Sequence, residues 1–133
     1  GSVLFVFENG KVAKVELAAY QTKSNRRKLT GAYSDKSPLK ALFRLTEDVQ
    51  LALYSTEGRA LVFSTAQLAA KTTRATQGVA VLTLKRKASL CRAVELERSG
   101  IVNAARYRTR TLPAAGALLR PEDAEEKQME LEL

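Results

Sequence analysis

Two Lys-x-x-Arg motifs stand 48 residues apart in this chain. The first is Lys23 with Arg26, and the second is Lys71 with Arg74. Ser-Asn separates the first pair of cations and Thr-Thr the second, and these hydroxyl and amide groups also bond phosphate oxygens. Lysine and arginine are ordinary occupants of solvated loops, so one such motif would carry little weight. Its repetition at an equivalent position favours contacts with phosphate.

Other basic residues extend this signal. Arg27 and Lys28 follow the first motif directly, and Lys85-Arg86-Lys87 predicts a charged hairpin turn. A rim of such cations can follow the backbone of duplex DNA, because each neutralised phosphate releases counterions. The pattern indicates neither base readout nor the clustered aromatic residues that stack single strands. The candidate DNA contacts are Lys11, Lys14, Lys23, Arg26, Arg27, Lys28, Arg59, Lys71, Arg74, Lys85, Arg86 and Lys87.

The sequence predicts no catalytic residue, no metal site and no cofactor. It contains no histidine, which excludes histidine bases and the common zinc-activated hydrolases. Its seven glycines are spaced as turns and not as a phosphate-binding loop. The carboxylate pairs Glu47/Asp48 and Glu95/Glu97 are interpreted as solvated acids, so an independent hydrolase has little support.

The single cysteine, Cys91, cannot form an internal disulfide and fits the reducing cytoplasm, where we expect the protein to reside. It lies in a stretch that is typical of a strand, so we predict a buried structural thiol and not a nucleophile. The longest apolar runs fall far short of the roughly 20 residues that a membrane span requires. No membrane partner is therefore expected.

The elements that would position the basic residues repeat with the same offset. Residues 3–17 align with residues 51–65, which places Gly10 on Gly58 and Lys11 on Arg59. Each copy predicts four strands, with Asn-Gly or Glu-Gly as a tight turn between the first two. The predicted strands are 3–8, 11–17, 29–34 and 39–46 in the first copy, and 50–56, 59–65, 78–85 and 89–96 in the second.

These four-stranded repeats predict an all-β, propeller-like fold. Leu4, Phe5, Val6 and Phe7 are apolar at every position, as expected for a strand that is buried on both faces. Two blades cannot close a ring, and repeat folds usually need at least three units. We therefore expect a piece of a larger array, whose open strand edges pair with another copy or exchange strands.

Charge divides the chain. Residues 1–120 hold 21 of the 22 basic and 8 of the 14 acidic residues, a formal charge of +13, whereas residues 121–133 carry −5. A basic body favours polyanionic partners, and an acidic end can compete for the same surface. The expected division is a cloning remnant at 1–2, blades at 3–49 and 50–98, an irregular segment at 99–120, and an acidic, disordered tail at 121–133.

The residues also resemble a known family. The stretch that begins LFVFENGKVAKVEL, and above all residues 71–79 (KTTRATQGV), resembles the C-terminal domain of the A subunit of bacterial DNA gyrase or of its paralogue, the topoisomerase IV A subunit. The resemblance covers residues 3–96, and residues 107–116 also resemble the end of the family's domain. It implies a six-bladed β-pinwheel whose neighbouring blades exchange strands and around which duplex DNA wraps. This chain would hold the last blades.

The same resemblance implies that the parent is an ATP-dependent type II topoisomerase of A2B2 composition. In that family, DNA cleavage and ATP hydrolysis lie in other domains, and an acidic tail tunes wrapping. The glycine-rich basic heptapeptide that marks the wrapping blade of gyrase is absent here. The sequence therefore does not distinguish a gyrase parent from a topoisomerase IV parent. The expected function is sequence-independent binding and wrapping of duplex DNA, and the alternative is a protein-interaction or structural β-repeat scaffold.

Overall fold

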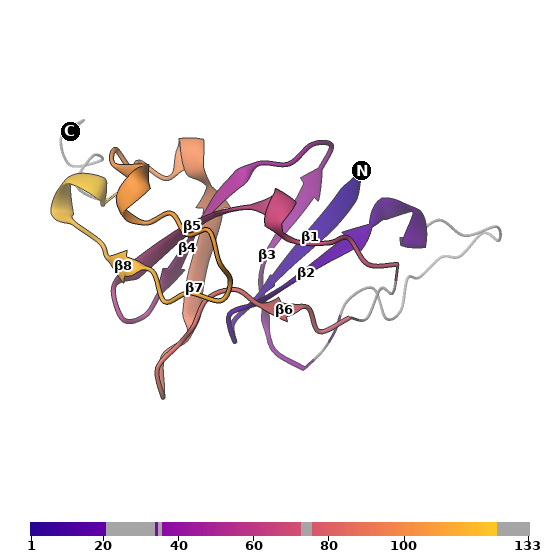
Figure 1. Cartoon of the computed structure of the whole chain (residues 1–133). Helices are drawn as coiled ribbons and strands as arrows, with labels where there is room; N and C mark the ends of the chain where they lie inside the picture. The colour runs from indigo at the N-terminus through magenta and orange to yellow at the C-terminus, as the bar shows by residue number, and fades with distance from the viewer. Residues whose placement is uncertain (21–33, 35, 73–75, 125–133) are drawn as a thin grey trace, which may run out of the picture.

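Two four-stranded antiparallel sheets lie next to each other in the computed structural model, which describes residues 1–20, 34, 36–72 and 76–124 (Figure 1). Helical structure in these residues is limited to five short 3-10 turns, η1 Leu17–Tyr20, η2 Thr65–Gln67, η3 Leu96–Arg98, η4 Ala104–Arg106 and η5 Pro121–Asp123. Among them, no helix is long and apolar enough to cross a membrane. The predicted all-β class is confirmed.

The first sheet has the order β3-β1-β2-β6 and the second the order β7-β4-β5-β8. The first consists of β1 Ser2–Phe7, β2 Lys11–Glu16, β3 Leu39–Leu45 and β6 Val79–Ala80. The second consists of β4 Gln50–Ser55, β5 Arg59–Ser64, β7 Leu90–Glu95 and β8 Ala117–Leu118. Both predicted hairpin turns are present, since Gly10 N–H donates to the Phe7 carbonyl and Gly58 N–H to that of Ser55.

Each sheet is completed by a strand from further along the chain. β6 follows β5 in sequence, yet it pairs with β2 of the first sheet, and β8 completes the second sheet in the same way. The strand expected at 78–85 is thus only two residues long and belongs to the neighbouring sheet. The segment 99–120, expected to be irregular, supplies β8. The strand expected at 29–34 lies outside the described residues except for Ser34, which is in no strand.

A glycine precedes each of these crossing strands. Gly78 has a φ of +83° and Gly116 a φ of +77°, both in the left-handed region that L side chains rarely adopt. A Cβ at Gly78 would lie 2.4 Å from the Val12 carbonyl oxygen, and one at Gly116 would lie 2.2 Å from that of Ala60. Only a residue without a side chain lets these two segments approach the second strand of each sheet so closely.

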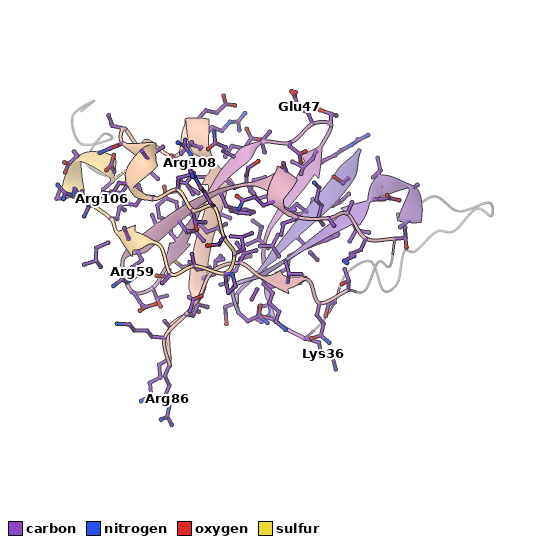
Figure 2. All side chains as sticks on the ribbon, in the orientation of Figure 1. Lys36, Glu47, Arg59, Arg86, Arg106 and Arg108 are labelled. Carbon is purple, nitrogen blue, oxygen red and sulfur yellow. The ribbon has the colours of Figure 1, made fainter. Side chains whose placement is uncertain are left out.

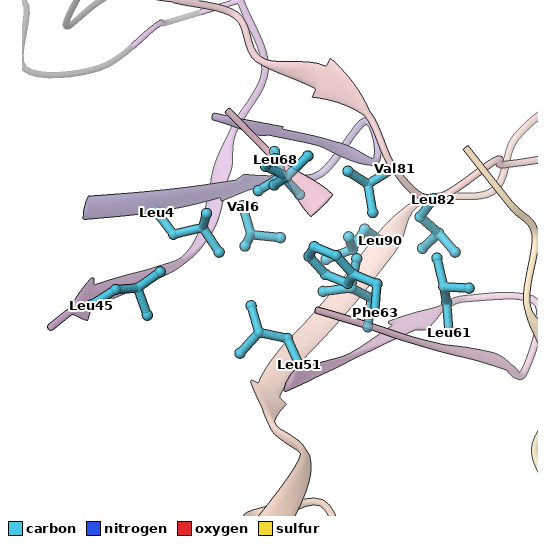
Figure 3. Close-up of a cluster of buried hydrophobic side chains, with 12 residues drawn as sticks. Leu4, Val6, Leu45, Leu51, Leu61, Phe63, Leu68, Val81, Leu82 and Leu90 are labelled. Atoms are coloured by element: carbon cyan, nitrogen blue, oxygen red, sulfur yellow. The ribbon is translucent and has the colours of Figure 1, made fainter. Parts of the chain in front are cut away.

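The main core lies between the two sheets (Figure 3). Leu4, Val6 and Val12 of the first sheet meet Leu51 and Phe63 of the second, and all are buried. The opposite face of the first sheet is also apolar, so β1 is buried at every position, as its sequence predicted. Strand exchange and face-to-face packing together join the two repeats into one unit.

Residues 96–124 cover the outer face of the second sheet. Tyr107 is buried there against Ala60 and Val62. Its hydroxyl donates to Asp123 Oδ2 at 2.7 Å and accepts the Arg120 N–H at 3.1 Å. Asp123 Oδ1 accepts the backbone N–H groups of residues 102 and 103 at 2.7 and 3.0 Å. This Tyr107–Asp123 clasp fixes the end of the described chain.

The clasp corrects the expectation of a disordered tail from residue 121. Asp123 is only 1% exposed. Burial raises the pKa of this carboxyl, but the hydrogen bonds from Tyr107, Asn103 and Val102 and the charge of Arg106 outweigh burial and hold it below its ordinary value. Burial likewise raises the pKa of Tyr107. Residues 125–133 lie outside the described residues.

A second polar contact joins the sheets at the edge of the core. The Lys14 ammonium donates to Asp48 Oδ1 at 2.9 Å and to the carbonyls of Thr65 and Leu68 at 3.0 and 3.2 Å. Thr65 Oγ1 donates to the same carboxylate at 2.8 Å and accepts the Val49 N–H. The hydrogen bonds from Lys14 and Thr65 lower the pKa of Asp48. Lys14 thus connects β2 with the loops on both sides of the second sheet's central hairpin.

Replacing Asp123 by alanine is expected to reduce the free energy of unfolding by about 3 kcal/mol, because the buried Tyr107 hydroxyl and two part-buried backbone N–H groups lose their acceptor. Asp123→Asn keeps an acceptor oxygen and should cost less, and Glu122→Ala, which removes an exposed acid next to it, should cost almost nothing. Urea unfolding measures the free energy of unfolding of all three variants. Equal losses for D123A and E122A would contradict the clasp.

The pH dependence of the clasp follows from its two pKa shifts. The lowered pKa of Asp123 contributes stability above the ordinary value of 3.8, which is lost as the pH falls through the folded pKa. The raised pKa of Tyr107 contributes stability below its ordinary value of 10.0, which is lost as the pH rises through the folded pKa. D123A should therefore approach the wild type in stability only at these extremes.

Replacing Lys14 by methionine is expected to reduce the free energy of unfolding by about 1–3 kcal/mol, because the carbonyls of Thr65 and Leu68 lose their shared donor. The pKa of Asp48 should also return toward 3.8, so less stability is lost on acidification below that pH. Lys11→Met, on the same strand and without a role in this joint, is the control. A smaller loss for K14M than for K11M in urea unfolding would contradict this role.

Candidate nucleic-acid interface

Five of the twelve predicted DNA contacts, Lys23, Arg26, Arg27, Lys28 and Arg74, lie outside the described residues. The first Lys-x-x-Arg motif therefore has no described geometry, and the second is represented by Lys71 alone. These five residues stay predictions. The remaining seven are Lys11, Lys14, Arg59, Lys71, Lys85, Arg86 and Lys87.

Lys71 is fixed alongside β2. Its backbone N–H donates to the Lys14 carbonyl at 2.7 Å, and its carbonyl accepts the Glu16 N–H at 2.8 Å, which forms a parallel bridge opposite Val15. The side chain is exposed. The second motif thus begins at a point where the backbone is held by the first sheet, while its cation faces solvent.

Arg108 lies beside the second sheet, one residue before the position that corresponds to Lys71. The Tyr107 carbonyl accepts the Val62 N–H at 2.8 Å and the Val62 carbonyl accepts the Thr109 N–H at 3.1 Å, so Arg108 forms a parallel bridge beside β5. Its side chain is exposed, and its Nε donates to Gln50 Oε1 at 2.9 Å (Figure 2). The residue equivalent to Lys71 is Thr109, whose N–H donates to the Val62 carbonyl as that of Lys71 donates to the Lys14 carbonyl. Arg108 is therefore a neighbouring exposed cation and not the counterpart of Lys71.

Arg108 is not among the predicted contacts, because residues 97–110 show no clean periodicity. Gly78 follows Lys71 by seven residues and Gly116 follows Thr109 by seven, so the spacing to the next glycine indicates Thr109 and not Arg108. Arg106 and Arg110, on either side of Arg108, are exposed as well.

A second group of cations gathers where the hairpin turns of both sheets lie. Lys11 begins β2 and pairs with Ala80, whereas Arg59 begins β5 and pairs with Leu118, so these two positions are equivalent. Both side chains are half-buried, and Arg59 Nη1 donates to the Gly116 carbonyl at 3.1 Å. We name this region, together with the exposed Lys85-Arg86-Lys87 turn beside it, the hairpin-turn end.

Lys14 is withdrawn from the candidate contacts. Its side chain is 11% exposed, and its ammonium already donates to one carboxylate and two carbonyls. A phosphate could reach this cation only if the joint between the sheets opened. Sequence alone could not show this, because Asp48 and Leu68 are distant from Lys14 in the chain.

Four acidic residues lie at the opposite end of the sheets, whereas Glu8 and Glu57 lie at the hairpin turns. Glu47, Asp48, Glu95 and Glu97 line one cleft of about 450 Å³ with Val49, Gln50 and Leu96. Figure 2 shows Glu47 far from Arg86. Because the pKa of Asp48 is lowered, this carboxyl is ionised at neutral pH and cannot act there as a proton donor. No three metal-ligating side chains converge within the described part of the chain.

Cys91 lies in β7, as expected for a strand residue, but the prediction that it is buried is wrong. β7 is the outer strand of its sheet, and its register with β4 shifts between Tyr54 and Ser55, close to Cys91. The side chain is exposed, with Sγ 3.4 Å from the Tyr54 carbonyl oxygen. Exposure alone gives this thiol no chemical role.

Comparison by sequence identifies no relative, since no protein-family model and no curated protein matches the chain. Comparison by structure identifies similar solved domains. The C-terminal domain of DNA gyrase A is similar with a TM-score of 0.65 and 16% identity, over 92% of this chain and 46% of that one. The C-terminal domain of DNA topoisomerase IV is similar with a TM-score of 0.64 and 24% identity, over 75% and 31%.

The E. coli ParC C-terminal domain is also similar, with a TM-score of 0.65 and 19% identity, over 97% of this chain and 58% of that one. The chain thus spans between about a third and three fifths of the length of these solved domains. At this identity the likeness establishes the fold alone. Together with the two exchanged four-stranded sheets, it confirms what the sequence resemblance implied: the chain has the β-pinwheel fold of the C-terminal domains of DNA gyrase A and topoisomerase IV.

Proposed function

We propose that this chain binds duplex DNA without sequence preference and bends it across the two sheets. The observation that carries the proposal is the repetition of cations at the hairpin-turn end, where Lys11 and Arg59 hold equivalent positions and the exposed Lys85-Arg86-Lys87 turn lies beside them. A DNA backbone presents regularly spaced phosphates, so a surface that repeats its cations from sheet to sheet suits it better than scattered charges. The parent would then be a type II topoisomerase that uses this module for wrapping.

Electrostatic polarity supports the same surface. The acidic cleft lies at the far end of the sheets from the hairpin-turn end, where cations outnumber the acids Glu8 and Glu57. The hairpin-turn end would attract a duplex and the cleft would repel it, so the proposed path of the duplex runs over Lys11, Arg59 and the Lys85-Arg86-Lys87 turn. The B subunit as a partner, and pairing with another copy through open strand edges, stay predictions.

Replacing Lys71 and Arg74 by glutamine is expected to weaken binding to all duplex sequences equally. The slope of log affinity against log salt should fall by about one unit for each phosphate contact that is lost. The measurement is fluorescence anisotropy with a labelled duplex of about 40 base pairs across a salt series. Arg108→Gln should weaken binding in the same way if this exposed cation also contacts the duplex.

The matched control is the pair Arg44→Gln and Arg98→Gln, which removes the same charge from exposed positions on β3 and η3. The control should leave the salt slope almost unchanged. If both double variants lost duplex affinity equally, the loss would reflect net charge alone and not contacts at specific positions. Absence of duplex binding by the wild type would favour the alternative function of a protein-interaction scaffold.

Removing residues 125–133 is expected to tighten duplex binding at low salt, because four carboxylates and one lysine leave the chain and the competing negative charge falls. The chain should end at Ala124 and not at Arg120, since Asp123 is part of the clasp. Unchanged affinity after this truncation would show that the tail does not compete with DNA. Truncation at Arg120 serves as a stability comparison, because it should lower the midpoint of unfolding.

A further inference from the structure

Residues 85–88 form a tight turn with an unusual backbone. Ala88 N–H donates to the Lys85 carbonyl at 3.0 Å, and Lys87 has a φ of +70°. Lys87 is the one non-glycine residue with positive φ in the described part of the chain. Such a conformation costs about 1–2 kcal/mol for a residue with a Cβ, and glycine or asparagine usually occupies it. Strain of this kind is concentrated at functional sites. Here the strained residue supplies a positive charge that glycine would not.

The base of this turn is anchored to both sheets. Leu90 N–H donates to the Glu8 carbonyl at 2.8 Å, beside the hairpin turn of the first sheet. Thr56 N–H donates to the Ser89 carbonyl at 2.9 Å and Thr56 Oγ1 accepts the Ser89 N–H at 3.0 Å, beside that of the second. Lys85 N–H points to Glu57 Oε1 at 3.4 Å. The turn is therefore held in one direction before any ligand arrives.

The tip carries three cations into solvent. Lys85, Arg86 and Lys87 are all exposed, and neither ion pair of the described residues involves them. Figure 1 shows the turn before β7 extending away from both sheets, and Figure 2 shows Arg86 at its end. A flat cationic surface contacts only the outermost phosphates of a duplex. A narrow cationic projection can also enter a groove.

We propose that Arg86 inserts into the minor groove of the bound duplex while Lys85 and Lys87 contact the phosphates on either side. The minor groove is about 6 Å wide and narrows in A-tracts, where its negative potential is strongest. Guanidinium is less strongly hydrated than ammonium, so it enters such a groove at a lower desolvation cost. This inference rests on the proposed function and adds to it a preference for DNA shape at one point of the path.

The test compares two labelled duplexes of equal length, one with A-tracts phased at the helical repeat and one rich in G·C pairs. The wild type should prefer the A-tract duplex by about fivefold. Arg86→Lys keeps the charge and should remove this preference while it leaves affinity for the G·C-rich duplex within about twofold. Arg110→Lys, at another exposed arginine, should keep the preference.

Netropsin, which occupies the minor groove, provides a second measurement. Added to the A-tract duplex, it should weaken binding of the wild type and have little effect on Arg86→Lys. Equal affinity of the wild type for both duplexes, or a preference that survives in Arg86→Lys, would overturn the inference and leave the proposed function standing. Failure to bind either duplex would overturn both.

Discussion

Both faces of the central strands are apolar, and the whole structure depends on covering them. β1 is buried at every position, and β4 at all but its first. If either face were uncovered, a continuous hydrophobic surface would be in contact with water, so a single sheet of this kind is not stable by itself. Packing the two sheets against each other covers one face of each. Residues 96–124 then cover the second face of the second sheet, where Tyr107 lies.

The 48-residue offset maps these faces onto one another. Val3, Phe5, Ala13 and Val15 line the outer cluster of the first sheet, and their equivalents Leu51, Leu53, Leu61 and Phe63 line the main core. In turn, Leu4, Val6 and Val12 of the main core correspond to Ala52, Tyr54 and Ala60 under Tyr107. Equivalent residues thus have the same orientation within their sheet but face different neighbours, as in any stack of repeated units.

Sequence patterns predicted the features that depend on local chemistry and repetition. The hairpins at Gly10 and Gly58, the doubly buried opening strand and the repeat itself are of this kind. They did not predict β6 and β8, because a two-residue strand has no periodicity and its pairing is set by close approach at Gly78 and Gly116.

The sequence likewise did not predict the roles of individual charged residues. Lys14 and Asp123 are typical surface residues by type, but Lys14 finds its acceptors and Asp123 its donors only after distant segments have packed.

Strand exchange also bears on biosynthesis. The first sheet lacks its last strand until Val79 and Ala80 have left the ribosome, after the central hairpin of the second sheet has already been made. Neither repeat can therefore mature as an autonomous folding domain, and a deletion at a repeat boundary would leave an unfinished sheet in which β2 still pairs with β1 but has lost β6 from its other edge.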